Sequence, residues 1–503
     1  MTSTNQETTM NLNSNCLSTL PFRNLERSWL WLLAVVAACV LCGCEEKDVR
    51  SRVKWSPDGR AALVVASDGV HLADADGQLS PVLFGESYPI CWMPDSSHVV
   101  ACRHEEEKTW GAAAQYLPRD VQEQVAESAR KLRPILLAHT GDWNHWSKEE
   151  EEKLKNIDMT FSDAVMVYLR DYDDGALKKE IGDKVPEFMN SSVKIDVVQL
   201  YRMSAGAAQL ERVLYRTAAS VKEIRPSSNG KAVAVVEGSR DATGTSVVQL
   251  MVLLTAGGAP VNVARGVARF PDWSADGKAL AYIEKVGSAG SMVSGSLRRR
   301  AIFDGYDRLL KEPGGVQELA VTAFDPYARV RCLKDGRIVF SSAEVSLPAA
   351  PDSQSNRSML FCVDPKYARP IPLVAERFRY WLGDQAEFFA VSPDGRLVAV
   401  VCQCGEVYVL DVGAAKLTEV QARELDSETY KRAAFMPDWR SNDELTFCGP
   451  PGKVDDGHRI ADVVMYSISS GKGRSLSDGW PAEARAFLNK PETPQQRSGE
   501  KAK

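Results

Sequence analysis

The chain has 503 residues, of which 44% are hydrophobic and 25% are charged, with 35 glycines, 25 prolines and 11 cysteines. This composition excludes a disordered, collagen-like or disulfide-dense chain and a protein with many membrane spans. The length is sufficient for one large core or for several domains. The 61 basic and 67 acidic residues give a formal net charge of -6. Because the chain has no general positive charge to attract phosphate backbones, we expect no nucleic-acid partner.

The first 43 residues have the organisation of a secretion signal. An uncharged apolar run extends from Trp29 to Leu41 and follows two arginines. This run is too short for an ordinary membrane-spanning helix, which needs roughly 20 apolar residues, and its length is typical of a signal-peptide core. A simple uncleaved anchor or an ordinary secretory signal is the alternative. The polar stretch before the run is long, so either Met1 or Met10 is the true start.

The end of the apolar run resembles the lipobox of bacterial lipoproteins. Leu41, Cys42, Gly43 and Cys44 occupy its positions, with Cys42 in place of the usual Ala, Ser or Thr. The resemblance implies cleavage before Cys44 and acylation of its thiol with palmitate-type chains, which would hold the protein in a lipid bilayer. Residues 44–50 would then be a short linker. The resemblance places the mature protein in the bacterial cell envelope, facing the periplasm.

A motif recurs seven times after residue 50. Each copy has an aromatic or apolar strand end, a turn rich in Pro, Asp, Gly or Asn, and a second strand of apolar residues, which is the pattern of a β-hairpin. A third strand follows most hairpins, and the sequence VVQL occurs in it at both Val197 and Val247. A shorter fourth stretch completes a four-stranded unit. The motifs begin at Trp55, Cys91, Ile224, Asp272, Arg331, Ala390 and Asp438.

Four-stranded units repeated in this way stack radially as a propeller. The motif resembles the TolB-type, WD40-like propeller repeat, whose hallmark is an aromatic-Ser-Pro-Asp-Gly-basic turn. Residues 55–60 and 392–396 match it almost fully, and residues 273–278 differ mainly by Ala275 in place of Pro. We therefore expect an all-β fold, a β-propeller over residues 51–480, with seven four-stranded blades and six or eight as alternatives. The resemblance specifies the fold and says little about function.

One interval between motifs is anomalous. The second and third motifs begin near residues 92 and 225, 133 residues apart, whereas the other intervals are 37 to 59 residues. The excess maps to residues 104–192, where apolar side chains recur at helical spacing. We expect a helical insertion between the second and third strands of blade two. We expect shorter segments that leave the blade pattern at residues 296–315 and 345–358. A disordered tail is expected at residues 481–503.

The repeated carboxylates and tryptophans have structural explanations. Type I and I′ turns require Asp and Gly, so we interpret four repeated aspartates as turn residues: Asp58, Asp276, Asp335 and Asp394. Four tryptophans recur at one repeat position, and we expect them to be wedges between blades: Trp55, Trp92, Trp273 and Trp439.

The sequence contains no nucleophile elbow, P-loop, zinc-protease motif or EF-hand loop. The six histidines form no cluster with ligand spacing, and Cys402 with Cys404 is a weak metal signal. We therefore expect no catalytic residues, no metal and no cofactor. Seven cysteines would remain beyond Cys44, and this odd count argues against a disulfide framework, although Cys91 and Cys102 could pair across one hairpin.

The most unusual polar and aromatic stretch lies in a turn between two predicted insertion helices. Its side chains could contact a sugar, a peptide or a partner protein: His139, Asp142, Trp143, His145 and Trp146. The alternative is that both tryptophans pack the helical subdomain onto the propeller. The acidic runs at residues 105–107 and 149–152 are expected to be solvated helix faces, with an acidic docking surface or a weak cation site as alternatives.

These patterns together favour a lipid-anchored envelope protein that acts as a binding or scaffold module, with the lipid bilayer and an envelope protein as partners. The alternative is a propeller enzyme, or a binding protein, for envelope or extracellular carbohydrate or peptide, with its site in the central funnel or under the insertion. An enzyme would bring unlike polar residues together on one propeller face near Trp143 and His145. A funnel lined by small and apolar groups would exclude it.

Overall fold

The computed structural model describes the chain between residues 52 and 484. Four longer stretches within these limits are not described, at residues 344–357, 374–387, 422–436 and 452–460, together with interruptions of one to five residues elsewhere. The proposed signal, Cys44, the linker and the tail beyond residue 484 therefore lie outside the described residues, as do Asp142, Cys402 and Cys404.

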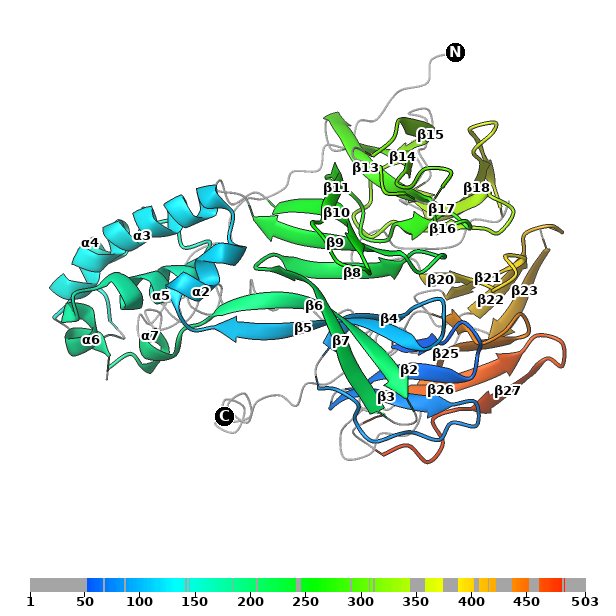
Figure 1. Cartoon of the computed structure of the whole chain (residues 1–503), viewed down its shortest axis with the longest axis horizontal. Helices are drawn as coiled ribbons and strands as arrows, with labels where there is room; N and C mark the ends of the chain where they lie inside the picture. Colours follow the sequence, from blue (N-terminus) through cyan, green and yellow to red (C-terminus); the bar gives the residue numbers. More distant parts are fainter. Residues whose placement is uncertain are drawn as a thin grey trace, which may run out of the picture.

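The strands form seven antiparallel sheets arranged in a ring, so the predicted seven-bladed propeller is confirmed (Figure 1). Each blade uses consecutive strands. Blade 1 has three strands, and residues 79 and 84 add isolated bridges to the third. Blades 1 to 3 comprise β1 (Val53–Trp55), β2 (Ala61–Ala66) and β3 (Gly69–Asp74); β4 (Ser87–Trp92), β5 (His98–Glu107), β6 (Val193–Ser204) and β7 (Ala207–Thr217); β8 (Ser220–Pro226), β9 (Ala232–Arg240), β10 (Ser246–Leu254) and β11 (Val261–Arg265).

Blades 4 to 7 each have four strands. They comprise β12 (Asp272–Trp273), β13 (Ala279–Ala289), β14 (Met292–Ala301) and β15 (Val316–Ala323); β16 (Val330–Cys332), β17 (Ile338–Ala343), β18 (Ser358–Asp364) and β19 (Arg369–Pro372); β20 (Phe388–Val391), β21 (Leu397–Val401), β22 (Val407–Asp411) and β23 (Lys416–Gln421); β24 (Asp438–Trp439), β25 (Glu444–Pro451), β26 (Ala461–Ser467) and β27 (Lys472–Ser475).

The repeated turns have the predicted chemistry. In the first motif, the Ser56 hydroxyl donates to the Asp58 carboxylate at 2.6 Å, and this carboxylate accepts the backbone N–H of Arg60. Gly59 follows with φ +69°, and a Cβ there would lie 2.4 Å from the Arg440 carbonyl of blade 7. Glycine is therefore needed both for the turn and for the contact between blades. The same serine-to-aspartate hydrogen bond recurs at Ser274–Asp276 and Ser392–Asp394.

The four repeated tryptophans are wedges between blades, as predicted. The indole Nε1 of Trp92, Trp273 and Trp439 donates to a carbonyl on the inner strand of the preceding blade, at 2.9, 2.9 and 3.0 Å respectively. The three acceptors are the carbonyls of Lys54, Arg225 and Ala390. One residue type thus provides both the apolar packing between blades and a directional bond that fixes their angle.

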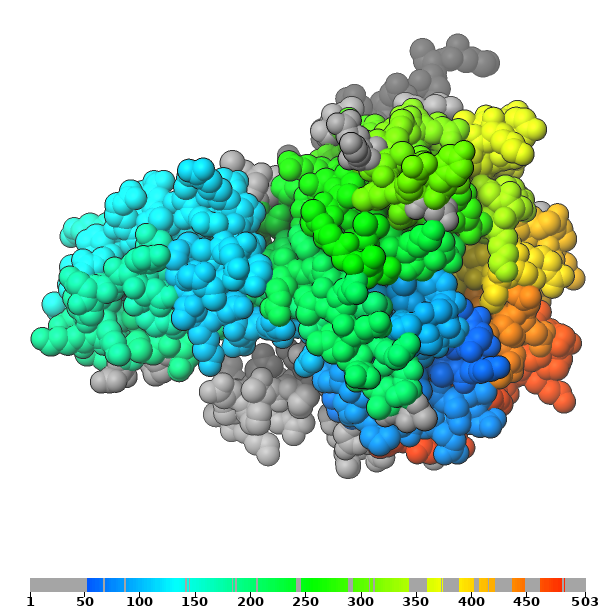
Figure 2. Space-filling view, in the orientation of Figure 1, coloured from blue at the N-terminus to red at the C-terminus, as the bar shows by residue number. Residues whose placement is uncertain are grey.

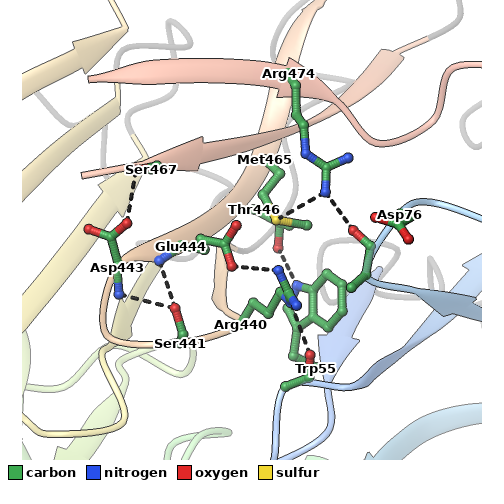
Figure 3. A network of polar contacts seen from close by, with 12 residues as sticks. Trp55, Asp76, Arg440, Ser441, Asp443, Glu444, Thr446, Met465, Ser467 and Arg474 are labelled. Carbon is green, nitrogen blue, oxygen red and sulfur yellow. Dashed lines mark hydrogen bonds and ion pairs between the residues drawn. The ribbon is translucent and has the colours of Figure 1, made fainter. Parts of the chain in front are cut away.

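The ring closes through side chains of blades 7 and 1 (Figure 3). The Trp55 indole donates to the Thr446 hydroxyl at 3.2 Å, and Arg440 Nε donates to the Gly59 carbonyl at 3.0 Å. Further out, Arg474 donates to the Ala75 carbonyl and the buried Trp480 indole donates to the Gly77 carbonyl. Among the described residues, blade 7 consists of four consecutive strands of the chain and shares none of them with blade 1.

A helical insertion separates β5 from β6, the second and third strands of blade 2, as predicted. Since the Asp-Gly turns join first to second strands, the insertion leaves the ring on the opposite face. It forms a separate lobe beside the ring (Figure 2). Its helices are α2 (Trp110–Ala113), the 3-10 helix η1 (Ala114–Tyr116), α3 (Arg119–Ala138), α4 (Lys148–Lys155), α5 (Ser162–Tyr172), α6 (Ala176–Ile181) and α7 (Pro186–Asn190).

The insertion has a core of its own. The apolar face of α3 is buried at the predicted helical spacing, by Val121, Val125, Ala129, Leu132 and Leu136. The same core includes three residues of β6, namely Val193, Ile195 and Val197. The β5–β6 ladder continues to the pair Glu107 and Val193. The lobe therefore stands on two paired strands. None of the helices in the described ranges is long and apolar enough to cross a membrane.

Two local predictions are wrong. Residues 105–107 belong to β5 and not to a helix, and Glu105 forms an ion pair with Arg216 of β7. Within the excursion predicted at residues 296–315, Arg298 to Arg300 lie in β14, where Arg298 forms an ion pair with Glu284 of the neighbouring strand at 2.7 Å. In both cases cross-strand ion pairs allow charged residues to continue a strand.

The cysteines of the first hairpin of blade 2 are free thiols. Cys91 and Cys102 are both buried in the apolar core between blades 2 and 3. Burial raises the pKa of both thiols. Such thiols behave as small hydrophobic residues and not as nucleophiles.

The wedge bonds predict a measurable loss of stability on removal of one indole. In Trp273→Phe the ring remains largely filled, but the buried Arg225 carbonyl loses its donor. We expect the free energy of unfolding in urea to fall by about 2 kcal/mol. Tyr306→Phe, which removes a hydroxyl from a side chain that is 82% exposed, is the control and should change little. Equal stabilities for the two variants would contradict the wedge role.

Candidate functional site

The predicted aromatic stretch forms a compact cluster inside the insertion. The His139 ring lies 4.6 Å from the Trp143 ring and 4.3 Å from the Trp146 ring, measured between centroids, and the two indoles are 5.8 Å apart, edge to face. Both tryptophans are partly buried and pack against the insertion core. The structure therefore brings together three of the five predicted contact residues. His145 is exposed, and Asp142 lies outside the described residues.

A capping carboxylate fixes this cluster. Glu150 accepts the backbone N–H of Ser147 at 2.7 Å, and the Ser147 hydroxyl accepts the Glu150 N–H, which together form a capping box at the start of α4. The second contact of Glu150 is with His139 Nδ1 at 3.0 Å. The hydrogen bond with Ser147 is the main cause that lowers the pKa of Glu150 to about 2, against the effect of burial. These bonds give Glu150, Ser147 and His139 Nδ1 structural roles. Among the described residues, His139 Nε2 and Trp146 Nε1 are buried without a hydrogen-bond partner.

A second polar cluster lies at the root of the insertion, between blades 2 and 3. Asp196 lies 2.6 Å from His104 Nδ1, and its other oxygen accepts the backbone N–H of Val221 at 2.7 Å. Nearby, Glu237 is buried and accepts a hydrogen bond from Gln249. Burial raises the pKa of Glu237. The cluster therefore lies between blades 2 and 3, and most of its carboxylate oxygens accept hydrogen bonds from within the protein.

The inner strands contribute a third cluster, which the sequence did not predict. Asp272 accepts a hydrogen bond from Arg225 Nε at 2.8 Å through one oxygen, and from the backbone N–H of Cys332 at 2.9 Å through the other. These residues belong to blades 4, 3 and 5 respectively. One carboxylate thus joins three successive blades next to the propeller axis.

The equivalent carboxylate of blade 7 has the same role. Asp438 accepts the backbone N–H of Trp55 at 2.7 Å. Burial raises the pKa of Asp438 to about 6, against the opposite effect of the Trp55 N–H and of the positive charges of Lys54 and Arg225. Lys54 donates to the Ile90 carbonyl at 2.6 Å. Lys54, Arg225 and Asp438 all lie on first strands of their blades, and these strands border the channel that blades leave around a propeller axis.

Two further charges of the inner strands form no ion pair among the described residues. Arg331 is 8% exposed, and its Nη1 donates to the Val330 carbonyl at 2.8 Å. Burial, together with the nearby Arg225 and Arg329, lowers the pKa of Arg331 well below its ordinary value. Glu223 is 5% exposed, and its Oε2 has no hydrogen-bond partner among the described residues.

The inner strands therefore place charged groups near the propeller axis. We name the axial cluster by its seven members: Lys54, Glu223, Arg225, Asp272, Arg329, Arg331 and Asp438. The condition that would exclude an enzyme is not met, but both aspartates are committed to bonds between blades. In the part of the chain that the structure describes, no group of three His, Cys, Asp or Glu side chains could hold a metal ion.

One signal in the sequence could have revealed this cluster. Apart from Asp142–Trp143 in the insertion, the dipeptide Asp-Trp occurs at Asp272–Trp273 and at Asp438–Trp439, both at the start of an inner strand. The tryptophan bonds back to the preceding blade and the aspartate bonds forward to the next. An acidic residue at one fixed repeat position beside a wedge indicates a bond between blades.

Fold and site together define a seven-bladed propeller with a charged axis and one helical lobe. No family model matches the chain, and no curated protein matches it. Among solved structures, it is similar to a protein assigned as TolB from Agrobacterium tumefaciens, with 14% identity over 53% of this chain and 83% of that chain, and a TM-score of 0.32.

Two enzymes are also similar in structure. An oligogalacturonate lyase from Vibrio parahaemolyticus shares 9% identity over 81% of this chain and 87% of its own, with a TM-score of 0.41. A puromycin-hydrolyzing peptidase of Mycobacterium tuberculosis shares 15% identity over 56% of this chain and only 42% of its own, with a TM-score of 0.38. These similarities are too distant to indicate an activity. The propeller assignment rests on the strand registers themselves.

The axial carboxylate of blade 7 predicts a specific pH dependence. Burial raises the pKa of Asp438 from 3.8 to about 6. The folded state then binds the proton more tightly than the unfolded state, so this group lowers stability as the pH rises from about 4 to about 6. Asp438→Asn keeps an oxygen for the Trp55 N–H and removes the titration. We expect its melting temperature, relative to wild type, to rise across this window. A constant difference would contradict the raised pKa.

Proposed function

We propose that the chain is a lipid-anchored envelope protein whose propeller is a scaffold and whose insertion binds a protein partner. The lipobox-like end of the apolar run at Cys44 supports the anchor. On this proposal the acylated Cys44 holds the protein to a membrane with the propeller facing the periplasm. Residues 45–52 are the only chain between the lipid and β1, so the ring would lie close to the membrane surface.

The observation that carries the binding role is the construction of the insertion. Its core is closed by its own helices and by three residues of β6. The lobe stands beside the ring without completing any blade (Figure 1). An insertion that the ring does not need for its own packing is the kind of element on which partner binding is placed.

Local contacts hold the lobe in a defined orientation on its two strands. The backbone N–H of Trp110 donates to Asp171 at 2.5 Å, which joins α2 to α5. Arg170 Nη1 donates to the carbonyls of Met189 and Ser191, at 2.9 and 2.8 Å, just before β6 begins. A preoriented lobe loses little conformational freedom on binding, which favours affinity.

The alternative function is that of a propeller enzyme for carbohydrate or peptide. Fewer observations support it. The cluster of His139, Trp143 and Trp146 is packed within the lobe, and Glu150 and Ser147 hold it from the α4 side. The axial cluster is charged, but its aspartates bond to neighbouring blades. Neither group combines a nucleophile with a positioned base.

Membrane attachment is tested by Cys44→Ala. We expect this variant to incorporate no labelled palmitate and to leave the membrane fraction, because the thiol is the only acylation point that a lipobox provides. Cys42→Ala places a usual residue at its position and is the matched control, which should remain acylated. Continued acylation and membrane retention of Cys44→Ala would refute the lipoprotein assignment.

Partner binding is tested by removing the lobe at its two supporting strands. Glu107 and Val193 are opposite each other in the ladder, so residues 108–192 can be replaced by an Asn-Gly turn. We expect this variant to fold as a propeller and to lose at least one protein that crosslinks to the wild type in intact cells. Arg265→Met, a change at an exposed position of blade 3, is the control. An unchanged set of crosslinked proteins after deletion would refute docking on the lobe.

A further inference from the structure

We propose that a cleft between blades 4 and 5 binds a small aromatic carboxylate. The cleft opens on the face of the ring that carries the Asp-Gly turns, because the turns of both blades line it. Its volume of about 570 Å³ is typical of ligand sites in proteins. The helical lobe leaves the ring on the opposite face, so the site is separate from the lobe.

The cleft lies where a cysteine replaces a wedge tryptophan. Trp92, Trp273 and Trp439 end the first strands of their blades, and each indole donates to a carbonyl of the preceding inner strand. Cys332 ends the first strand of blade 5, and its thiol donates to the Asp272 carbonyl of blade 4 at 3.9 Å. A thiol fills much less space than an indole. The cavity that Cys332 lines therefore begins where an indole lies at the other three junctions.

A residue of the opposite wall also departs from the repeat. In blade 3, Val252 of the third strand pairs with Ala234, and both are buried in the core that contains Trp273. The pair at the same distance from the turn in blade 4 is Arg299 and Ala281. Ala281 is buried between blades 4 and 5, but Arg299 is half-buried and lines the cleft. This junction thus has a thiol and a guanidinium in place of two apolar core groups.

The turn of blade 5 does not pack against the turn of blade 4. A Cβ added at the turn glycines Gly59, Gly277 and Gly395 would lie 2.4, 2.8 and 3.4 Å from the nearest atom of the preceding blade. At Gly336, the equivalent glycine of blade 5, a Cβ would meet no atom of the described residues within 4 Å, its chain neighbours aside. The contact between turns that closes the other three junctions is therefore missing here.

The two walls of the cleft are nevertheless held together on both sides of it. At the inner strands, Asp272 accepts the Cys332 N–H at 2.9 Å. At the outer strand of blade 4, Gln317 Nε2 donates to the Pro365 carbonyl of blade 5 at 2.7 Å. The cleft is thus formed before a ligand binds, which reduces the cost of ordering the protein.

The basic groups of the cleft are available to a ligand, whereas its acidic groups are held by their own turns. Three basic side chains line the cleft and form no hydrogen bond or ion pair within the described part of the chain: Arg299, Lys334 and Lys366. Asp276 accepts the Ser274 hydroxyl at 2.5 Å, and Asp364 accepts the backbone N–H two residues later at 2.9 Å. Asp335 pairs with Arg337 at 2.8 Å. The available groups are therefore mainly cationic, which favours an anion.

The order of burial along the cleft indicates the form of this anion. Lys334 and Lys366 are exposed, Arg299 is half-buried, and Ile338 is only 1% exposed. A ring fits beside Ile338 and Cys332, where the other junctions have an indole. A carboxylate attached to the ring then meets the basic side chains nearer the surface. The planar guanidinium of Arg299 can hold it with two parallel hydrogen bonds.

Calorimetry on the purified full-length chain tests the site with three probes. Indole supplies the ring, propionate supplies the charge, and indole-3-propionate supplies both. Cys332→Trp fills the cleft with the missing wedge, and Cys332→Ser keeps the cleft open. Arg299→Met removes the guanidinium, and Arg265→Met, at an exposed position of blade 3, is the matched loss of one positive charge. Asp276→Asn removes a negative charge from the wall of the cleft.

We expect wild type to bind indole-3-propionate about tenfold more tightly than indole or propionate, since one charge-assisted hydrogen bond has this effect. Cys332→Ser and Arg265→Met should match wild type. Arg299→Met should bind about tenfold more weakly, and Cys332→Trp should not bind. Asp276→Asn should bind more tightly, because a repulsive charge is gone.

Absence of binding by wild type would overturn the site, as would equal affinities of wild type and Cys332→Trp. Arg299→Met decides the question if Cys332→Trp does not fold, because an unchanged affinity in that variant would also overturn the site. Weaker binding by Asp276→Asn would overturn an anionic ligand. None of these results bears on the anchor or on the lobe.

Discussion

The structure depends on the hydrogen bond that each wedge tryptophan donates to the blade before it. Apolar packing alone does not fix the angle between two sheets, because it has no direction. The indole N–H supplies this direction at Trp92, Trp273 and Trp439. At Trp55 the same group donates to the Thr446 hydroxyl, and the final contact of the ring is thereby made by the first repeat. Blades whose turns depart from the repeat motif can therefore still pack in one ring.

The axis and the lobe divide the molecule into two chemical environments. Around the axis, buried charges are arranged on short inner strands, and two aspartates hold neighbouring blades at 2.7 to 2.9 Å. In the lobe, the charges of α4 are mostly exposed and pair along the helix, as in Glu149–Lys153. The first environment joins neighbouring blades, and a macromolecular surface suits the second.

The sequence predicted the features that repeat or that have a period. Seven hairpin motifs, the helical spacing of Val121 to Leu136 and the 133-residue interval were sufficient for the blades and the position of the insertion. The sequence could not predict contacts between residues far apart in the chain. Asp272 meets Cys332 across 60 residues, and Trp55 meets Asp438 across 383. Charge runs are typical of helices, so the sequence predicts a helix at Glu105, whereas cross-strand pairing with Arg216 keeps this residue in a strand.

The order of the described strands within each blade has a consequence for how the ring is assembled. In the part of the chain that the structure describes, the strands of every blade follow one another in sequence, so each blade can form as soon as its own segment is available. Contact between the first and last blades is then the last step of assembly. Side chains such as Arg440 and Trp480 hold the two blades together. Opening the ring between blades 7 and 1 would break these side-chain contacts and leave the strand pairing within each blade intact.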